Sequence, residues 1–229
     1  MLNHLSVGVQ TWGSAILLGR RMAKYPDQFG LFDTFNGKGI RMLELGAGTG
    51  LLSILCRKLL DLKAATDFLS SDRRERGGEG LIVATDFLPE VMDNLTTCVN
   101  LNFPSSTETG IEIAKLDWTT FPTYMAKRSV SSLQTTPNVV DDEGGEGVEE
   151  TSRYMNEPFD LILASDCVYD ETHAKMLREV VSWTLRLPEG DNPGGTFVCP
   201  HSHSFSSATR IQLIKSTSCP PYGRLLRQS

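Results

Sequence analysis

The stretch ELGAGTG, residues 44–50, follows the short apolar run at 40–45 and precedes residues 51–62, whose apolar spacing predicts a helix. Glycines let a backbone turn sharply and approach a ligand closely. The helix that follows offers free N–H groups at its N-terminus. In open α/β sheets, nucleotide-like cofactors bind at this place, beyond the carboxyl end of a strand. The stretch therefore predicts a cofactor site after the first strand.

The glycine spacing narrows the choice of cofactor. A dinucleotide-binding loop has the pattern GxGxxG, whereas Gly46, Gly48 and Gly50 form GxGxG with Glu44 before them. This pattern suits a cofactor with a positively charged amino acid end and no pyrophosphate, a description that S-adenosylmethionine fits. It disfavours a nicotinamide-dependent oxidoreductase. The plainer alternative is a glycine-rich turn between a strand and a helix that binds nothing.

Alternating elements extend outward from this loop. Apolar runs predict strands at 40–45, 81–85, 111–116, 159–164 and 196–199, and periodic segments predict helices at 10–25, 51–62, 89–100 and 171–187. This order predicts an α/β fold with a mainly parallel sheet that is covered on both faces. We expect one domain over residues 1–229, with flexible insertions at 70–80 and 127–157 and an irregular tail at 201–229. The second insertion contains the acidic run at 141–150.

Composition excludes several classes of function. The 229 residues carry a formal net charge of −6, which argues against binding to nucleic acid. No apolar run approaches the roughly 18 residues that span a bilayer, and residues 1–10 lack the pattern of a secretory signal. The five cysteines never form CxxC, which suits reduced thiols, and the lone pair His201 and His203 predicts no metal site. We expect a monomer in the cytoplasm, with the nucleus as a second compartment.

Two carboxylates compete for the ribose of the cofactor, because the pentapeptide ATDFL occurs at both 65–69 and 84–88. Asp67 lies nearer the usual distance of about 20 residues after the glycines. Asp86 follows the stronger apolar run and precedes a good helix start at Pro89. We prefer Asp86, because the site requires a strand that leads into a helix.

Two further motifs end predicted strands at the same edge of the sheet. Asp117 can accept a hydrogen bond from an adenine amino group and Trp118 can stack on its ring, although a strand end with a half-buried tryptophan is an equally good interpretation. Asp166 and Tyr169 follow the fourth strand beside the glycines, where a carboxylate and a phenol can hold and orient an amine. Alternatively, Asp166 caps the next helix and Tyr169 only packs.

Together these motifs resemble the seven-β-strand protein-lysine methyltransferases of the methyltransferase-like group, the family-16 methyltransferases. The resemblance rests on TWGS at 11–14, ELGAGTG at 44–50, TDFLPEVMDNL at 85–95, LDW at 116–118 and ASDCVY at 164–169. It implies a Rossmann-like, class I fold and S-adenosylmethionine as methyl donor. It places around the cofactor Trp12, Gly46, Ala47, Gly48, Asp86, Trp118 and Ser165, supported by Glu44 and Asp117. It places Asp166 and Tyr169 at the acceptor lysine of a protein such as a translation factor or chaperone.

The expected chemistry is displacement of a methyl group by a neutral amine. The reference pKa of lysine is about 10.4, and a nearby carboxylate raises it further. We therefore expect Asp166 to orient the amine first and to act as a base second. Alternatives are another acceptor (arginine, histidine or a small molecule) and a catalytically silent binding module. The silent module is favoured by the C-terminus, because residues 205–229 do not predict the hairpin that completes the family's sheet.

Overall fold

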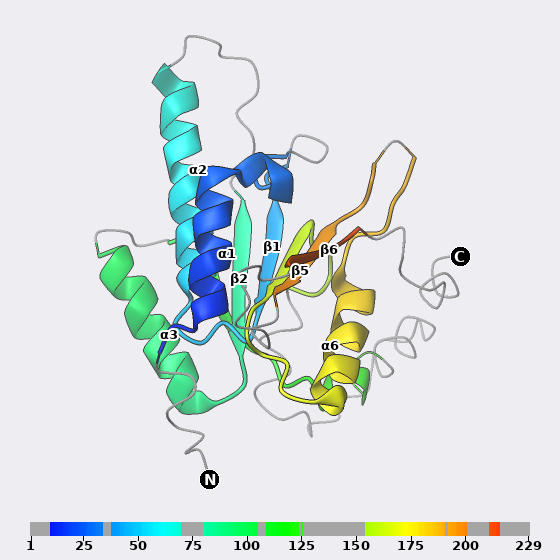
Figure 1. Cartoon of the computed structure of the whole chain (residues 1–229). Coiled ribbons are helices and arrows are strands. Elements are labelled where there is room, and N and C mark those ends of the chain that lie inside the picture. The colour runs from blue at the N-terminus through cyan, green and yellow to red at the C-terminus, as the bar shows by residue number, and fades with distance from the viewer. Residues whose placement is uncertain are drawn as a thin grey trace, which may run out of the picture.

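A six-stranded sheet in the order β3-β2-β1-β4-β5-β6 forms the centre of the computed structural model (Figure 1). The structure describes residues 10–33, 38–69, 80–104, 109–123, 125, 154–190 and 192–200, and the backbone of 211–215. The strands are β1 (Arg41–Leu45), β2 (Leu81–Asp86), β3 (Ile111–Lys115), β4 (Leu161–Ala164), β5 (Thr196–Pro200) and β6 (Ile211–Lys215). β1 to β5 pair in parallel and β6 runs antiparallel to β5. The strand order reverses between β1 and β4, which is where such sheets bind ligands.

Helices cover the sheet and create two hydrophobic clusters. They are α1 (Gly13–Lys24), α2 (Leu51–Leu69), α3 (Pro89–Asn102) and α6 (Glu171–Thr184), with a short 3-10 helix at Pro26–Phe29. Successive strand residues point to opposite faces, so Met42 belongs to the cluster with α1 and α2, while Leu43 belongs to the cluster with α6. The apolar runs that predicted strands are thus buried from both sides. The predicted mainly parallel α/β sheet is confirmed.

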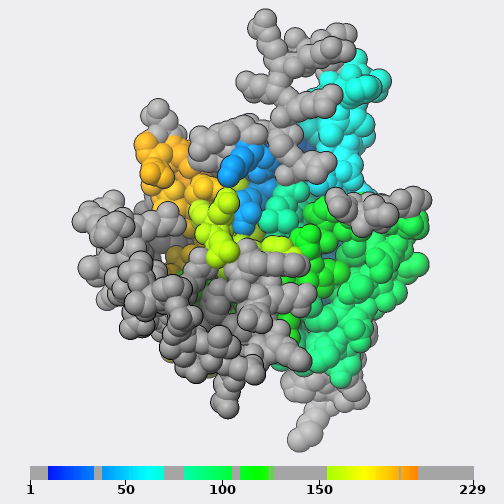
Figure 2. Space-filling model, turned by 180° about the vertical axis from the view of Figure 1, so that it is seen from behind, coloured from blue at the N-terminus to red at the C-terminus, as the bar shows by residue number. Residues whose placement is uncertain are grey.

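Helix α2 is longer than predicted, ending at Leu69 instead of residue 62. Its last turns contain the first copy of ATDFL, in which Asp67 pairs with Lys63 one turn earlier. Residues 61–69 are all exposed, among them Phe68 and Leu69. This end of α2, coloured cyan, projects at the upper right of the space-filling view (Figure 2). With no glycine or proline to stop it, the helix continues beyond the residues that it buries.

The C-terminal part corrects one prediction. Residues 201–229 were expected to be irregular, yet residues 211–215 form β6, which pairs along the whole of β5 from Thr196 to Pro200. The sequence IQLIK is rich in β-branched residues, and pairing satisfies the backbone groups that an open edge of β5 would expose. Residues 201–210 and 216–229 lie outside the described residues.

The predicted insertions are only partly described. The second one was expected to reach residue 157, but Tyr154 and Met155 are buried in the cluster with α6. The Tyr154 hydroxyl lies 2.5 Å from the Glu112 carboxylate of β3 and donates a hydrogen bond to it. The segment therefore rejoins the core before residue 157. Residues 70–79 and 126–153, with the acidic run, lie outside the described residues.

A membrane-spanning helix and a metal site are both absent from the residues that the structure describes. Among these residues, no helix is long and apolar enough to cross a membrane. No group of three or more His, Cys, Asp and Glu side chains in the same residues could hold a metal ion. His201 and His203 lie outside them.

Burial raises the pKa of the Cys167 thiol well above its ordinary value, so this cysteine is neutral and is no nucleophile.

Candidate functional site

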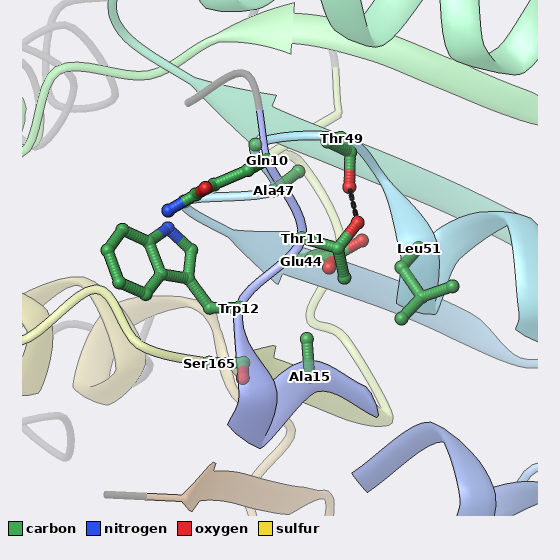
Figure 3. A pocket seen from close by; sticks show the side chains of 11 residues that line it. Gln10, Thr11, Trp12, Ala15, Glu44, Ala47, Thr49, Leu51 and Ser165 are labelled. Atoms are coloured by element: carbon green, nitrogen blue, oxygen red, sulfur yellow. Dashed lines mark hydrogen bonds between the residues drawn. The ribbon is translucent and has the colours of Figure 1, made fainter. Parts of the chain in front are cut away.

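A pocket opens at the carboxyl ends of β1 and β4, where the strand order reverses (Figure 3). Its lining comes from the segment before α1 and the start of that helix, from the end of β1 through the glycine loop to the start of α2, and from the loop after β4. The lining residues are Gln10, Thr11, Trp12, Ala15, Glu44, Gly46, Ala47, Gly48, Thr49, Leu51 and Ser165. Six of the eleven residues predicted for the site therefore line one pocket: Trp12, Glu44, Gly46, Ala47, Gly48 and Ser165.

The glycine loop needs its glycines for backbone geometry. Gly46, Gly48 and Gly50 have φ angles of 65°, 56° and 72°, in the left-handed region that side chains disfavour. The Ala47 N–H donates to the Thr85 carbonyl at 2.9 Å, which ties the loop to the neighbouring strand β2. The loop is thus held in one shape, with the backbone of Gly46 and Gly48 at the pocket wall.

Gly46→Ala is expected to destabilise the protein by about 2–4 kcal/mol, the sum of left-handed strain and overpacking. A Cβ at Gly46 would lie 2.8 Å from the Cβ of Cys167, an atom that no side-chain rotation can move. Gly13→Ala is the matched control, because a Cβ there meets nothing within 4 Å. Urea unfolding of both variants measures the difference. Equal stability of the two variants would contradict this account of the loop.

The structure separates the two candidate carboxylates of the ATDFL copies. Asp86 ends β2, and its Oδ2 accepts a hydrogen bond from the Gly48 N–H at 3.1 Å. Asp67 lies near the end of α2, exposed and paired with Lys63. Only Asp86 touches the glycine loop, in the place where the strand-to-helix context predicted a carboxylate.

Glu44 is buried, with only 3% of the residue exposed, and it closes the start of α2. Its Oε2 accepts hydrogen bonds from the Ser53 N–H at 2.9 Å and from the Ser53 hydroxyl at 2.5 Å. The prediction that the first N–H groups of α2 lack partners is therefore wrong for Ser53. Burial raises the pKa of Glu44 to about 7, more than these hydrogen bonds lower it.

This raised pKa gives the protein a pH dependence of known sign. The carboxyl titrates near 4.5 in the unfolded chain and near 7 in the folded one. Folding therefore favours the protonated form, so this group's contribution is full below pH 4.5 and falls as the pH rises to 7. The loss is about 3 kcal/mol. We expect Glu44→Gln to remove that part of the decline when unfolding free energies at pH 5 and pH 8 are compared. A variant that declines as steeply as the wild type would contradict this assignment.

The segment before α1 connects the two loops of the pocket. The Thr11 and Thr49 hydroxyls hydrogen-bond at 2.8 Å, which anchors the segment to the glycine loop (Figure 3). Trp12 follows and lies along the pocket with Gln10. Ser14, in the first turn of α1, then reaches the loop after β4. Residues 10–14 thus form a strap across the pocket.

Asp166 meets the far end of this strap. Its Oδ2 accepts hydrogen bonds from the Ser14 N–H at 3.1 Å and from the Ser14 hydroxyl. The residue has a φ of 53°, which aspartate tolerates better than most side chains. Asp166 therefore caps α1 from 152 residues away in the sequence. It does not cap the next helix, since the Asp170 side chain does so by accepting from the His173 N–H.

Three further predicted residues, Tyr169, Asp117 and Trp118, do not line the pocket. Tyr169 is exposed, and its ring meets that of His173 edge-on with centroids 5.6 Å apart. The Asp117 carboxylate accepts from the Thr119 N–H and hydroxyl, which closes a local turn after β3. Trp118 is half-buried and packs against the cluster with α6. Adenine contacts by Asp117 and Trp118 stay a prediction, which these local contacts do not test.

Comparison with known proteins places the chain among methyltransferases. A profile described as lysine methyltransferase matches residues 2–133, more than half of the chain. The chain is similar to the protein-lysine N-methyltransferase rrg1 of Schizosaccharomyces pombe, with 27% identity over 174 residues, covering 75% of this chain and 40% of that protein. It is also similar to the protein-lysine N-methyltransferase EFM2 of Saccharomyces cerevisiae, with 25% identity over 182 residues. That match covers 77% of this chain and 34% of EFM2. The chain thus spans less than half the length of these curated relatives.

Solved structures of similar fold include other methyltransferases. A magnesium protoporphyrin IX methyltransferase from Synechocystis, with bound S-adenosylhomocysteine, is 11% identical with a TM-score of 0.45, covering 95% of this chain and 74% of that one. The glycopeptide N-methyltransferase MtfA, complexed with sinefungin, is 14% identical with a TM-score of 0.43. That match covers 82% of this chain and 51% of MtfA.

Proposed function

Because this chain belongs to the lysine methyltransferase family, whose methyl donor is S-adenosylmethionine, we propose that it transfers a methyl group to a lysine side chain of a protein. The observation that supports the proposal is that the predicted cofactor loop and the loop of the predicted acceptor site meet at one pocket. The glycine loop and Ser165 both line it, and Ser165 is linked to the carboxylate of Asp166 through the Ser14 hydroxyl. The proposal includes a protein substrate such as a translation factor or chaperone, a monomeric enzyme and a cytoplasmic location.

The pocket residues fit S-adenosylmethionine. Gly46 and Gly48 present backbone in the left-handed conformation, where a Cβ would clash or be strained. Asp86 stands beside them and would hold the ribose hydroxyls, while Trp12 and Ser165 would close the pocket over the ligand. When bound, S-adenosylmethionine supplies a methyl group on a sulfonium sulfur, from which an amine can displace it.

The chain's own residues would position the amine. The Oδ1 atom of Asp166 is buried and has no hydrogen-bond partner among the described residues. Such an oxygen can accept a hydrogen bond from an amine and stabilise the cation that methylation produces. Because the same charge raises the pKa of the amine, Asp166 serves orientation more than deprotonation. Much of the rate would come from holding the amine in line.

Two measurements test this function. Calorimetric titration with S-adenosylmethionine, with NAD in parallel, is expected to show micromolar binding of the first compound alone. Incubation with tritiated S-adenosylmethionine and a protein extract, followed by acid hydrolysis, is then expected to give labelled methyl-lysine. Label in methyl-arginine, methyl-histidine or a small molecule would assign another acceptor. A folded sample that binds no S-adenosylmethionine would be a silent member of the family.

A further inference from the structure

One oxygen of the Asp166 carboxylate is occupied by Ser14 and the other is left without a partner. Oδ2 receives both the N–H and the hydroxyl of Ser14, whereas Oδ1 is buried and unpaired among the described residues. We propose that Ser14 is a positioning residue, which fixes the carboxylate so that Oδ1 receives the acceptor amine. This inference rests on the proposed methyl transfer and assigns a role to a residue outside the pocket lining.

The hydrogen bonds around Ser14 have a single consistent direction. An ionised carboxylate only accepts, so the Ser14 hydroxyl donates to Asp166. The Ser14 and Ser165 hydroxyls are 2.7 Å apart, and since the Ser14 proton is already used, the Ser165 hydroxyl donates to Ser14. An ordered chain therefore runs from Ser165, in the pocket wall, through Ser14 to Asp166. Ser14 is 3% exposed, so water does not compete for these bonds.

The unpaired Oδ1 is the part of this arrangement that points to a ligand. A buried carboxylate oxygen without a donor costs free energy, because it has lost water and gained nothing. Asp166 also keeps an uncommon left-handed backbone, a feature that concentrates at functional sites. Capping of α1 uses Oδ2 only, so it does not account for the buried Oδ1. An amine or ammonium group placed at Oδ1 supplies the missing donor.

The test compares two ligands that need no protein substrate. Sinefungin carries an ammonium group where S-adenosylmethionine carries its methyl group, while S-adenosylhomocysteine has neither. We expect the wild type to bind sinefungin more tightly than S-adenosylhomocysteine by calorimetry. Ser14→Ala is expected to reduce that preference about fivefold, the effect of one lost hydrogen bond, and to leave the affinity for S-adenosylhomocysteine unchanged. A merely structural role would weaken both ligands equally.

Matched variants separate the hydroxyl from the shape of the side chain. Ser14→Thr and Ser14→Val have nearly equal bulk, and only the threonine is expected to keep the preference for sinefungin. Ser182→Ala changes a serine on α6 whose hydroxyl donates to the Glu179 carbonyl, and it is expected to change neither affinity. A wild type that binds S-adenosylhomocysteine without preferring sinefungin would overturn the inference and leave the proposed function standing. A wild type that binds neither ligand would overturn both.

Discussion

Asp166→Asn is expected to lower the rate of methyl transfer by about 100-fold or more, while cofactor binding stays as in the wild type. The amide oxygen of asparagine can still accept from the Ser14 N–H and hydroxyl, so α1 keeps its cap. The negative charge that would orient the amine and stabilise the methylated cation is lost. Rates of label transfer at saturating S-adenosylmethionine, with calorimetry of the same samples, measure the two effects separately.

Asp166→Ala provides the contrast. It removes the charge and also the acceptor for α1, whose N-terminal end carries Trp12 into the pocket. We therefore expect it to lose methyl transfer, to bind S-adenosylmethionine more weakly and to unfold with about 1 kcal/mol less stability. If Asp166→Asn transfers methyl groups as fast as the wild type, the carboxylate serves only the cap and the assignment of the acceptor site is wrong.

Asp86→Ala is expected to weaken S-adenosylmethionine binding by about 100-fold. Hydrogen bonds to a charged group contribute about 1.5–3 kcal/mol each, and two ribose hydroxyls would be lost, which together exceeds a hundredfold change in affinity. The variant also frees the Gly48 N–H that Asp86 accepts from. Calorimetric titration measures the dissociation constant.

The sequence supplies an unusually close control for this experiment. Asp67→Ala changes the same residue in the same pentapeptide, but on the exposed end of α2. Its binding is expected to match the wild type, with at most the small stability change of a surface ion pair, up to about 1 kcal/mol. Equal weakening by the two variants would show that the effect is not specific to the strand end, and would contradict the ribose site.

The spacing of apolar residues and glycines predicted those elements whose structure depends on their own short segment. The runs at 40–45 and 81–85 are buried strands because most of their residues on both faces are apolar. ELGAGTG turns between strand and helix because only glycine adopts its φ angles freely. β6 was missed because it becomes a strand by pairing with β5, and nothing within residues 211–215 signals that partner. The length of α2 was missed because its last turns bury nothing that a periodic pattern could reveal.

In the candidate site, too, some residues could be predicted from the sequence and others could not. Asp86 could be found from the order strand, carboxylate, helix. The contact between Ser14 and Asp166 joins residues 152 positions apart, and no spacing signals it. The start of α2 was also misjudged, since whether a helix end is open depends on where the preceding glutamate points. Asp117 and Trp118 contact the turn after β3 and the cluster with α6, and their predicted contact with adenine stays a prediction.

The way Glu44 closes α2 bears on how the pocket selects among the nucleotides of a cell. A phosphate group usually binds at a helix start through unpaired N–H groups, but the Ser53 N–H is already bound to a buried carboxylate. ATP and NAD would bring negative charge toward an acid that ionises near pH 7. We therefore expect Glu44, an internal residue, to disfavour the binding of phosphorylated nucleotides. Glu44→Gln would relax that exclusion, visible as inhibition by ATP that the wild type does not show.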